Sequence, residues 1–334
     1  MSEARNVLVI GEISCDGVQS STLEMMNIGR SLAADLGEEL TLVVLGSDLG
    51  EIANDCLKYG VDKVYAVEHP LLEQAQIDLH LEALTSLCRA IAPNAVIVGR
   101  TSLGRELAPR LAFRLGVGLA QDALSVTVDA DTKRLIVNRP VYGGNAMAIV
   151  CCNQNPQVVS IRPKVYKALK QLATEECTGE VVPFAVELDS SMVKVKTLNV
   201  VKEESKGIKL EDARIVVAGG RGLGTPDAFK QLEVLSELLS AGLGASRAVV
   251  DSGWVPQSMQ IGLTGKSISP ELYITVAISG ASQHMAGCSG SKVIVAINKD
   301  SAANIFKEAR YGVVGDWSKV LPAFTETIRE LMAN

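Results

Sequence analysis

Short apolar runs alternate with amphipathic segments along the first part of the chain. Four runs are typical of strands buried on both faces of a parallel sheet: Val7 to Ile10, Leu40 to Leu45, Val64 to Val67 and Ala95 to Val98. The segments between and after them have helical spacing: Ser21 to Leu36, Glu51 to Tyr59, Glu73 to Ile91, and the stripe Leu103, Leu107, Leu111 and Leu115. This alternation predicts a series of βαβ units.

The pattern changes between Leu124 and Ile161, where short alternating segments surround two turn sequences. Asp129 to Thr132 and Tyr142 to Asn145 have the residues of hairpin loops, so the interval predicts an antiparallel extension. Further along, the polar run Lys202 to Gly207 has no apolar periodicity. We place the domain boundary there, with an N-terminal domain of residues 1–205 and a C-terminal domain of residues 206–334.

A second series of strands and helices follows this boundary. The predicted strands are Arg214 to Ala218, Ala248 to Val250, Tyr273 to Ile278 and Lys292 to Ile297. One helix is predicted from Pro226, which suits a first helical turn, and a last helix carries Leu321, Phe324, Ile328 and Leu331. The sequence therefore predicts an α/β protein with two Rossmann-like domains and mainly parallel sheets, the first with an antiparallel extension.

The composition is that of a globular protein and argues against several partners. Of the 334 residues, 47% are hydrophobic, and the net charge of −6 lacks the basic surplus that binds nucleic acid. The N-terminus has no signal-peptide pattern, and the charge-free stretch between Arg139 and Arg162 is interrupted by glycine, asparagine and proline. We expect no nucleic-acid partner, no membrane span and a cytoplasmic location.

The seven cysteines form no Cys-x-x-Cys pair, and several lie in apolar segments. This distribution is typical of buried thiols in a reducing compartment. Three scattered histidines do not complete a cluster that would hold zinc or an iron–sulfur centre. We therefore expect no metal site.

Candidate ligand-binding residues gather where predicted strands end, because open parallel sheets bind ligands at the carboxyl ends of their strands. Gly219-Gly-Arg-Gly-Leu-Gly224 follows a predicted strand, its glycines allow close approach to a phosphate or a ring, and Arg221 adds positive charge. The spacing departs from G-x-G-x-x-G at Thr225. The residues alone leave a nucleotide site and a tight turn equally open.

A second small-residue turn, Ser279-Gly-Ala-Ser-Gln-His284, follows another predicted strand. If it opens a helix, it offers a seat for a pyrophosphate, and two such turns in one domain favour a dinucleotide. His284 is either a residue facing the ligand or a structural histidine with its own partners. The residues leave both open.

Three further positions near strand ends have two interpretations each. Asn298 and Asp300 end a predicted strand, where they either face a ligand or cap the next segment. Asp316 is either a ligand or the N-cap of the last helix, and Ser246-Arg247 either belongs to the site or forms a loop ion pair. No Ser/His/Asp nucleophile and no paired carboxylates are identifiable.

Longer segments resemble the alpha subunits of electron-transfer flavoproteins. In the second domain they are Gly219 to Gly224, Gly244 to Arg247, Asp251 to Pro256, Gln260 to Lys266, Pro270 to Tyr273, Ser279 to Gly287 and Val295 to Asp300. In the first domain, Thr101 to Arg105, Leu107 to Leu111 and Arg139 to Ala146 are similar to the same family. The resemblance extends over essentially the whole chain.

This resemblance implies a heterodimer with a beta subunit, contacted by the N-terminal domain. The C-terminal domain would bind FAD and pass electrons between flavin dehydrogenases, such as acyl-CoA dehydrogenases, and an acceptor. The positions implied to contact FAD are Arg221, Ser246, Arg247, Gln260, Ile261, Gly262, Leu263, Thr264, Ser279, Gly280, Ala281, Ser282, Gln283, His284, Asn298, Asp316 and Trp317.

Three of these residues are implied to set the flavin potential. Arg247 would lie against the isoalloxazine, Thr264 would hydrogen-bond its N5 edge, and His284 would approach its N1/O2 edge. Donors or cations placed there would stabilise the negative charge that reduction adds to the ring. The sequence departs from the family at Leu263, where glutamine is usual, so a side-chain contact is missing there.

Three alternatives remain open at this point. One is a module that only senses a nucleotide or binds a partner, which the N-terminal α/β domain suggests. Electron-bifurcating members of the family, which divide electrons from NADH toward ferredoxin, differ largely in a beta subunit that holds AMP or a second FAD. This chain does not separate them from simple carriers. The glycine-rich turns also fit an NAD-dependent enzyme on a related nucleotide-binding fold, for which no catalytic base or lysine nucleophile is identifiable.

Overall fold

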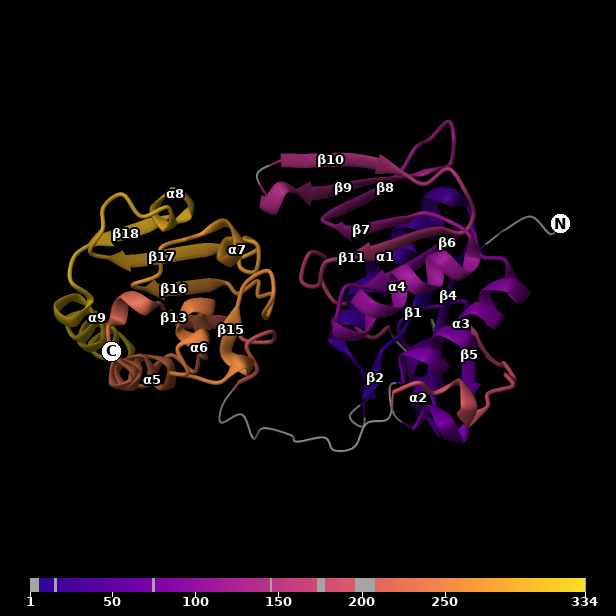
Figure 1. Ribbon diagram of the computed structural model, residues 1–334, viewed down its shortest axis with the longest axis horizontal. Coiled ribbons are helices and arrows are strands. Elements are labelled where there is room, and N and C mark those ends of the chain that lie inside the picture. The colour runs from indigo at the N-terminus through magenta and orange to yellow at the C-terminus, as the bar shows by residue number, and fades with distance from the viewer. Residues whose placement is uncertain are drawn as a thin grey trace. The chain divides into compact units, whose positions relative to one another are not determined.

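The computed structural model describes residues 6–14, 17–73, 76–144, 146–172, 178–195 and 208–333. The chain folds into two compact units, one built mainly from residues up to 200 and the other mainly from residues after 200. Each unit contains a parallel sheet with helices packed on it (Figure 1). The predicted boundary between residues 205 and 206 lies outside the described residues and stays a prediction.

The first unit is built on a seven-stranded parallel sheet with the order β12-β5-β4-β1-β6-β11-β7. Its strands are β1 (Asn6–Ile10), β4 (Glu39–Gly46), β5 (Lys63–Glu68), β6 (Ala95–Gly99), β7 (Leu119–Ala123), β11 (Gln157–Ile161) and β12 (Glu180–Pro183). Its helices are α1 (Ser20–Leu36), α2 (Ile52–Leu57), α3 (Ile77–Ile91) and α4 (Ser102–Leu115).

Helices cover both faces of this sheet, which explains why its strands read as continuous apolar runs. Val7 and Val9 of β1 pack in one core with residues of α1 and α2. Leu8, between them, packs in a second core with residues of α3 and α4. Successive side chains of a strand point to opposite faces, so a strand covered on both sides is apolar at most of its positions. The predicted strands and helices of this region are confirmed.

The antiparallel extension is confirmed in part. Strands β8 (Ser125–Val128), β9 (Leu135–Val141) and β10 (Ala146–Cys151) form an antiparallel sheet in the order β10-β9-β8, and β2 (Ile13–Ser14) pairs with β3 (Gly17–Val18). The prediction is wrong for the last segment of the interval, because β11 pairs in parallel with β6 and β7. All five residues of β11 are buried, which is the pattern of a central parallel strand.

The second unit contains a six-stranded parallel sheet with the order β15-β14-β13-β16-β17-β18. The strands are β13 (Ile215–Gly219), β14 (Gly242–Ser246), β15 (Gln260–Ile261), β16 (Leu272–Val276), β17 (Val293–Asn298) and β18 (Tyr311–Val314). The helices are α5 (Phe229–Leu238), α6 (Arg247–Asp251), α7 (Ser282–Met285), α8 (Ile305–Glu308) and α9 (Trp317–Ala333), and α5 packs beside α9 (Figure 1). Counted along the chain, this is the strand order 3-2-1-4-5-6 of doubly wound nucleotide-binding sheets.

One strand of the second unit was predicted at the wrong place. Ala248 to Val250 lies in helix α6, and the strand that was expected there is β14, a few residues earlier. Strand β14 is rich in glycine because its neighbours approach closely. A Cβ at Gly244 would lie 2.3 Å from Cδ1 of Ile261, and one at Gly242 would lie 2.9 Å from Cβ of Ala213. Such a strand lacks the β-branched residues by which strands are recognised.

The prediction of buried thiols is confirmed at three positions, holds only in part for the half-buried Cys152, and is wrong at one position. Cys56, Cys88 and Cys288 are buried, whereas Cys151 is exposed at the end of β10. Strand β10 forms the edge of an antiparallel sheet and leaves alternate side chains in solvent. Cys15 and Cys177 lie outside the described residues. Within the described ranges, no helix is long and apolar enough to cross a membrane.

Candidate functional site

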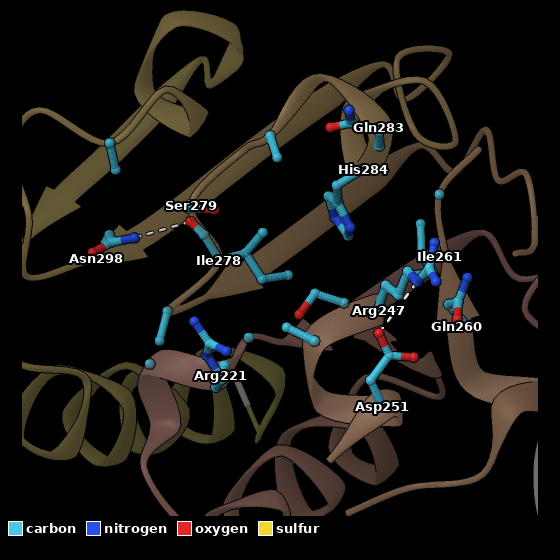
Figure 2. Close-up of a pocket in the computed structure, with 18 of the residues that line it drawn as sticks. Arg221, Arg247, Asp251, Gln260, Ile261, Ile278, Ser279, Gln283, His284 and Asn298 are labelled. Atoms are coloured by element: carbon cyan, nitrogen blue, oxygen red, sulfur yellow. Dashed lines mark hydrogen bonds and ion pairs between the residues drawn. The ribbon is translucent and has the colours of Figure 1, made fainter. Parts of the chain in front are cut away.

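A cavity of about 730 Å³ lies in the second unit beyond the carboxyl ends of β13, β14, β16 and β17 (Figure 2). Strand β13 is the first of its sheet, and the chain leaves it to β14 on one side and returns to β16 on the other. The loops after β13 and β16 therefore diverge and leave a crevice, which is where doubly wound sheets bind ligands. The volume is within the range of cofactor sites.

Glycines after β13 allow its loop to approach the loop after β16. The Gly220 N–H donates to the carbonyl of Val276 at 2.9 Å. A Cβ at Gly220 would lie 2.1 Å from the carbonyl oxygen of Ala277, so no larger residue fits. Ala277 itself has a φ of +56°, a conformation that non-glycine residues rarely adopt and that is often found beside ligand sites. Arg221 follows in a 3₁₀ turn and lines the cavity.

Helix α6 carries the charged residues that line the cavity beyond β14. Its first residue, Arg247, forms an ion pair with Asp251 one turn later, with 3.2 Å between Nε and Oδ2 (Figure 2). The two side chains are 66% and 61% exposed, so the guanidinium stays accessible to a ligand. Ser246 precedes the helix without a side-chain cap hydrogen bond. The predicted loop ion pair is thus a helical pair that faces the cavity.

The segment after β15 forms a further part of the lining. The Gln260 side-chain amide donates to Oγ1 of Thr264 at 3.0 Å, and Gly262 has a φ of +145°. The Leu263 N–H donates to the carbonyl of Gln283 at 2.7 Å and is therefore engaged within the protein. Leu263 therefore offers a ligand neither a polar side chain nor a free N–H. Glutamine, which is usual at this position in the family that the sequence resembles, would offer a polar side chain.

His284 lies at the back of the cavity, in the short helix α7, and is 7% exposed. Its Nε2 is 2.8 Å from the hydroxyl of Tyr273, and its Nδ1 is buried without a hydrogen-bond partner. Burial lowers the pKa of His284 from 6.5 to about 4. The nearby backbone of Ile261, which does not give Nδ1 a hydrogen bond of normal geometry, opposes this shift by favouring the protonated ring. A buried polar atom without a protein partner on a cavity wall indicates a bonding partner in a ligand.

Asn298 and Asp300 organise the loop after β17. The Asn298 amide donates to the carbonyl of Ile278 at 2.9 Å, and its oxygen accepts from the N–H of Asp300 at 3.0 Å. The Asp300 carboxylate accepts from the N–H of Ala302 at 2.9 Å. Both residues line the cavity, so the capping role and the lining role occur together.

Thirteen of the seventeen predicted contact residues line this cavity: Arg221, Ser246, Arg247, Gln260, Ile261, Gly262, Leu263, Thr264, Ser279, Ala281, Gln283, His284 and Asn298. The other four are Gly280, Ser282, Asp316 and Trp317. Asp316 accepts from the Ser318 N–H at 3.0 Å and caps α9, and Trp317 packs against the core of the second unit. The contact of all seventeen residues with FAD stays a prediction.

The cavity also contains residues that sequence reasoning missed, above all Asp251, Ala277 and Ile278. Asp251 lies four residues after Arg247, a spacing that indicates an ion pair only if the segment is helical. Because the segment Ala248 to Val250 was predicted to be a strand, the ion pair between Arg247 and Asp251 was not predicted. Within the described part of the chain, no group of histidine, cysteine and acidic residues is placed to hold a metal ion.

The doubly wound sheet and the cavity at its switch point define a nucleotide-cofactor-binding protein. Residues 7–189 match the family model of the electron transfer flavoprotein domain, and residues 209–289 match that of the electron transfer flavoprotein FAD-binding domain. The chain belongs to the electron transfer flavoprotein family and corresponds to its alpha subunit. Its second unit binds FAD, and the protein transfers electrons.

Relatives agree over nearly the full length. The chain is 37% identical to the electron transfer flavoprotein subunit alpha of Thermoanaerobacterium thermosaccharolyticum, over 99% of this chain and 100% of the relative. It is 38% identical to the subunit alpha of Megasphaera elsdenii, over 99% and 98%. It is also 34% identical to the acryloyl-CoA reductase electron transfer subunit beta of Anaerotignum propionicum, over 93% and 92%. The family resemblance of the sequence is confirmed.

The residues present fit FAD. The loops after β13 and β15 line the cavity with glycines, whose backbone a pyrophosphate or a flat ring can approach closely. The exposed guanidinium of Arg247 offers positive charge, and Nδ1 of His284 has no protein partner. These are the features expected around a dinucleotide with a redox-active ring.

Proposed function

We propose that this chain pairs with a beta subunit and carries electrons from a flavin dehydrogenase, such as an acyl-CoA dehydrogenase, to an acceptor in the cytoplasm. The single observation that supports this most is the FAD-matching unit in which Arg247 and His284 line one cavity. The relative named as an electron transfer subunit of acryloyl-CoA reductase supports a partner that acts on acyl-CoA substrates.

We infer a role for each group around the ring position. FAD, when bound, supplies the electron-transfer chemistry. Arg247 holds a positive charge beside the ring, Asp251 orients that guanidinium, and His284 directs a polar atom at the ring edge. Thr264, whose hydroxyl accepts from Gln260, is placed to bond a further edge. Positive charge and donors held there favour the reduced ring, because electrostatic stabilisation is strong in a partly dry site.

The glycine loops would hold the other part of the cofactor. The loop that contains Gly220 and Arg221 carries the close backbone approach and the positive charge that a pyrophosphate needs. Ser279 and Ala281, after β16, complete the same wall. This assignment places the phosphates at the switch point and the ring toward α6 and α7.

Cofactor counting tests this function and separates its variants. The chain is co-expressed with the beta subunit of its own organism, the complex is purified and denatured, and FAD and AMP are counted per heterodimer. One FAD and one AMP support a simple carrier, and two FAD support an electron-bifurcating complex. A colourless complex that reduces NAD with a substrate overturns the proposal in favour of an NAD-dependent enzyme.

The partner is tested separately. An acyl-CoA dehydrogenase with its substrate should reduce the flavin of the complex, which is followed by loss of the absorbance of oxidised flavin. If the flavin is bound but no acyl-CoA dehydrogenase reduces it, the carrier function stands and the partner class is wrong.

A further inference from the structure

A buried tyrosine contacts the histidine at the back of the cavity. Tyr273 is the second residue of β16 and is fully buried, and its hydroxyl is 2.8 Å from Nε2 of His284. The two rings are nearly parallel, with 6.2 Å between centroids and 24° between planes. Tyrosine and histidine therefore meet in one orientation, from a rigid strand and a short helix.

The direction of this hydrogen bond follows from the surroundings of the hydroxyl. Burial raises the pKa of Tyr273 well above 10, so its oxygen keeps the proton. Burial also keeps His284 neutral at pH 7, and a neutral imidazole has one N–H donor and one acceptor nitrogen. If Nε2 were the donor, the hydroxyl proton of Tyr273 would need another acceptor within the core. The hydroxyl therefore donates to Nε2, and the ring proton is on Nδ1.

Nδ1 has no hydrogen bond of normal geometry within the protein, although the backbone of Ile261 lies near enough to the imidazole to favour its protonated form. It is buried, it belongs to a residue that lines the cavity, and in Figure 2 the ring of His284 points from α7 toward the cavity. The site therefore contains a donor that is ready for an acceptor atom of the cofactor, such as a ring carbonyl oxygen.

We propose that Tyr273 is a positioning residue that holds His284 as a neutral imidazole with its proton on Nδ1, so that the cavity presents a directed, uncharged donor at this wall. The use of this donor by the ring rests on the proposed function. The tautomer itself does not depend on it, so the two can fail separately.

The chain contains an internal reference for each tautomer, since its three histidines are His69, His80 and His284. Nδ1 of His80 is 3.0 Å from the carbonyl of Gln76, so it carries the proton. Nδ1 of His69 accepts from the N–H of Leu71 at 3.2 Å, so its proton is on Nε2. Both contacts lie in the first unit, and neither histidine belongs to the cavity lining.

The test is nitrogen NMR of the full chain in its complex, with isotopically labelled histidine, at pH 7. We expect His284 to give the pattern of His80, with the proton on Nδ1. Tyr273→Phe should move the His284 signals toward an average of both tautomers and leave His69 and His80 unchanged. Retention of FAD by this variant should fall about five-fold, the effect of one hydrogen bond.

Thr275→Val is the matched control. It removes another buried hydroxyl from the same strand, which donates to Val295, and should leave the His284 signals unchanged. A doubly protonated His284, or a proton on Nε2 as in His69, overturns the proposal in the unmodified chain, even if Tyr273→Phe does not fold. A folded Tyr273→Phe protein with unchanged His284 signals also overturns it. Loss of FAD with an unchanged tautomer contradicts only the proposed use of the donor.

Discussion

The first and second sheets place four strands in the same order, β5-β4-β1-β6 and β15-β14-β13-β16, yet different residues follow the strands at their carboxyl ends. In the first unit, Glu12 follows β1 and accepts from the hydroxyl of Thr101, which follows β6. The backbone of Glu12 also exchanges two hydrogen bonds with the side chain of Thr22. In the second unit, the same positions are occupied by the loop of Gly220 and by Ala277, and a cavity opens beyond them.

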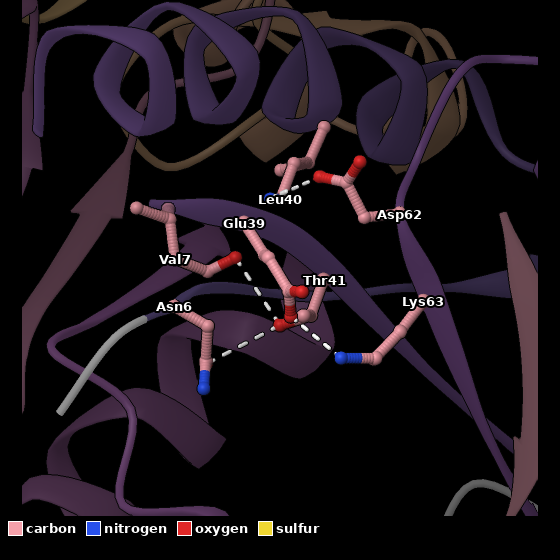
Figure 3. A network of polar contacts seen from close by, with 7 residues as sticks. All are labelled: Asn6, Val7, Glu39, Leu40, Thr41, Asp62 and Lys63. Carbon is pink, nitrogen blue, oxygen red and sulfur yellow. Dashed lines mark hydrogen bonds and ion pairs between the residues drawn. The ribbon is translucent and has the colours of Figure 1, made fainter. Parts of the chain in front are cut away.

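Helix packing strengthens this contrast. A Cβ at Gly104 of α4 would lie 1.9 Å from the carbonyl oxygen of Gly99, so the helix after β6 is pressed against the end of its strand. At the other end of the first sheet, where β4 and β5 begin, side chains join these neighbouring strands (Figure 3). Lys63 pairs with Glu39 at 2.7 Å, and Asp62 accepts from the N–H of Leu40 at 2.7 Å. The strand order provides a switch point in both units, and the residues at the strand ends make the two surroundings different.

The largest effect should come from adding a methyl group to the glycine loop after β13. In Gly220→Ala the added methyl would collide with backbone atoms of Ala277, which cannot move as a flexible side chain can. We expect the substitution to destabilise the loop or its binding of FAD by about 3 kcal/mol. The FAD content per heterodimer should fall more than ten-fold. Gly118→Ala is the control, because a Cβ there meets open space. Normal flavin content in Gly220→Ala would contradict the assigned role of this loop.

Acid should change the contributions of His284 and Glu12 to the stability of their units in opposite directions. The pKa of His284 is lowered to about 4, so its stabilising contribution is complete above pH 6.5 and is lost as the pH falls toward 4. The full loss is about 3 kcal/mol. Burial raises the pKa of Glu12 above 4.5, although the Thr101 hydrogen bond opposes it, so the contribution of Glu12 is complete below pH 4.5 and is lost as the pH rises.

Denaturant unfolding at several pH values checks this difference. Both tryptophans, Trp254 and Trp317, belong to the second unit, so their fluorescence follows it alone. His284→Gln should flatten the dependence of this signal on pH between 6.5 and 4, whereas Glu12→Gln should leave it as it is. An equal slope in the unmodified chain and in His284→Gln would show that the histidine is not neutral and buried.

The strands were predictable where burial on both faces of a sheet alone explains an apolar run in the sequence. The strands β1, β4, β5 and β6 are covered on both faces, and no other short element needs an uninterrupted apolar run. Strand β14 was not predictable in this way, because contacts with Ile261 and Ala213 require glycine at positions where strands usually carry β-branched residues. Strand β11 was placed in the wrong sheet, because the pairing partner of a strand is a tertiary property.

The site was predictable from the family resemblance, and the loops rich in small residues indicated its place. Local spacing alone left Gly219 to Gly224 open between a turn and a nucleotide site, and the departure at Thr225 explains why. The contact of Tyr273 with His284 joins a strand and a later helix, so no sequence periodicity reveals it. The pair of Arg247 and Asp251 was hidden by the wrong prediction of a strand over Ala248 to Val250.

The positive charge of Arg247 in the cavity lining can be tested by its effect on the FAD potential. Arg247→Ala removes the guanidinium that lines it, and we expect the FAD potential to fall by about 60 mV, the equivalent of about 1.4 kcal/mol for one electron. The singly reduced, negative flavin should also become less populated in a spectroelectrochemical titration. Arg310→Ala also removes one positive charge, from a residue that directly precedes β18 and does not line the cavity. It should change neither the FAD potential nor the population of the singly reduced flavin. Unchanged stepwise reduction in Arg247→Ala would rule out its assigned role.

The smallest effect should have the opposite sign. Asp251→Asn removes the negative partner of Arg247 while it keeps the size of the side chain, so the positive charge beside the ring is less compensated. Because both side chains are more than half exposed, the expected rise in the FAD potential is only about 10–40 mV. Asp227→Asn, which breaks an exposed pair with Lys230 outside the cavity lining, should leave the potential unchanged. A fall in Asp251→Asn would mean that orientation of the guanidinium outweighs compensation of its charge, because a mobile arginine stabilises the reduced ring less than a fixed one.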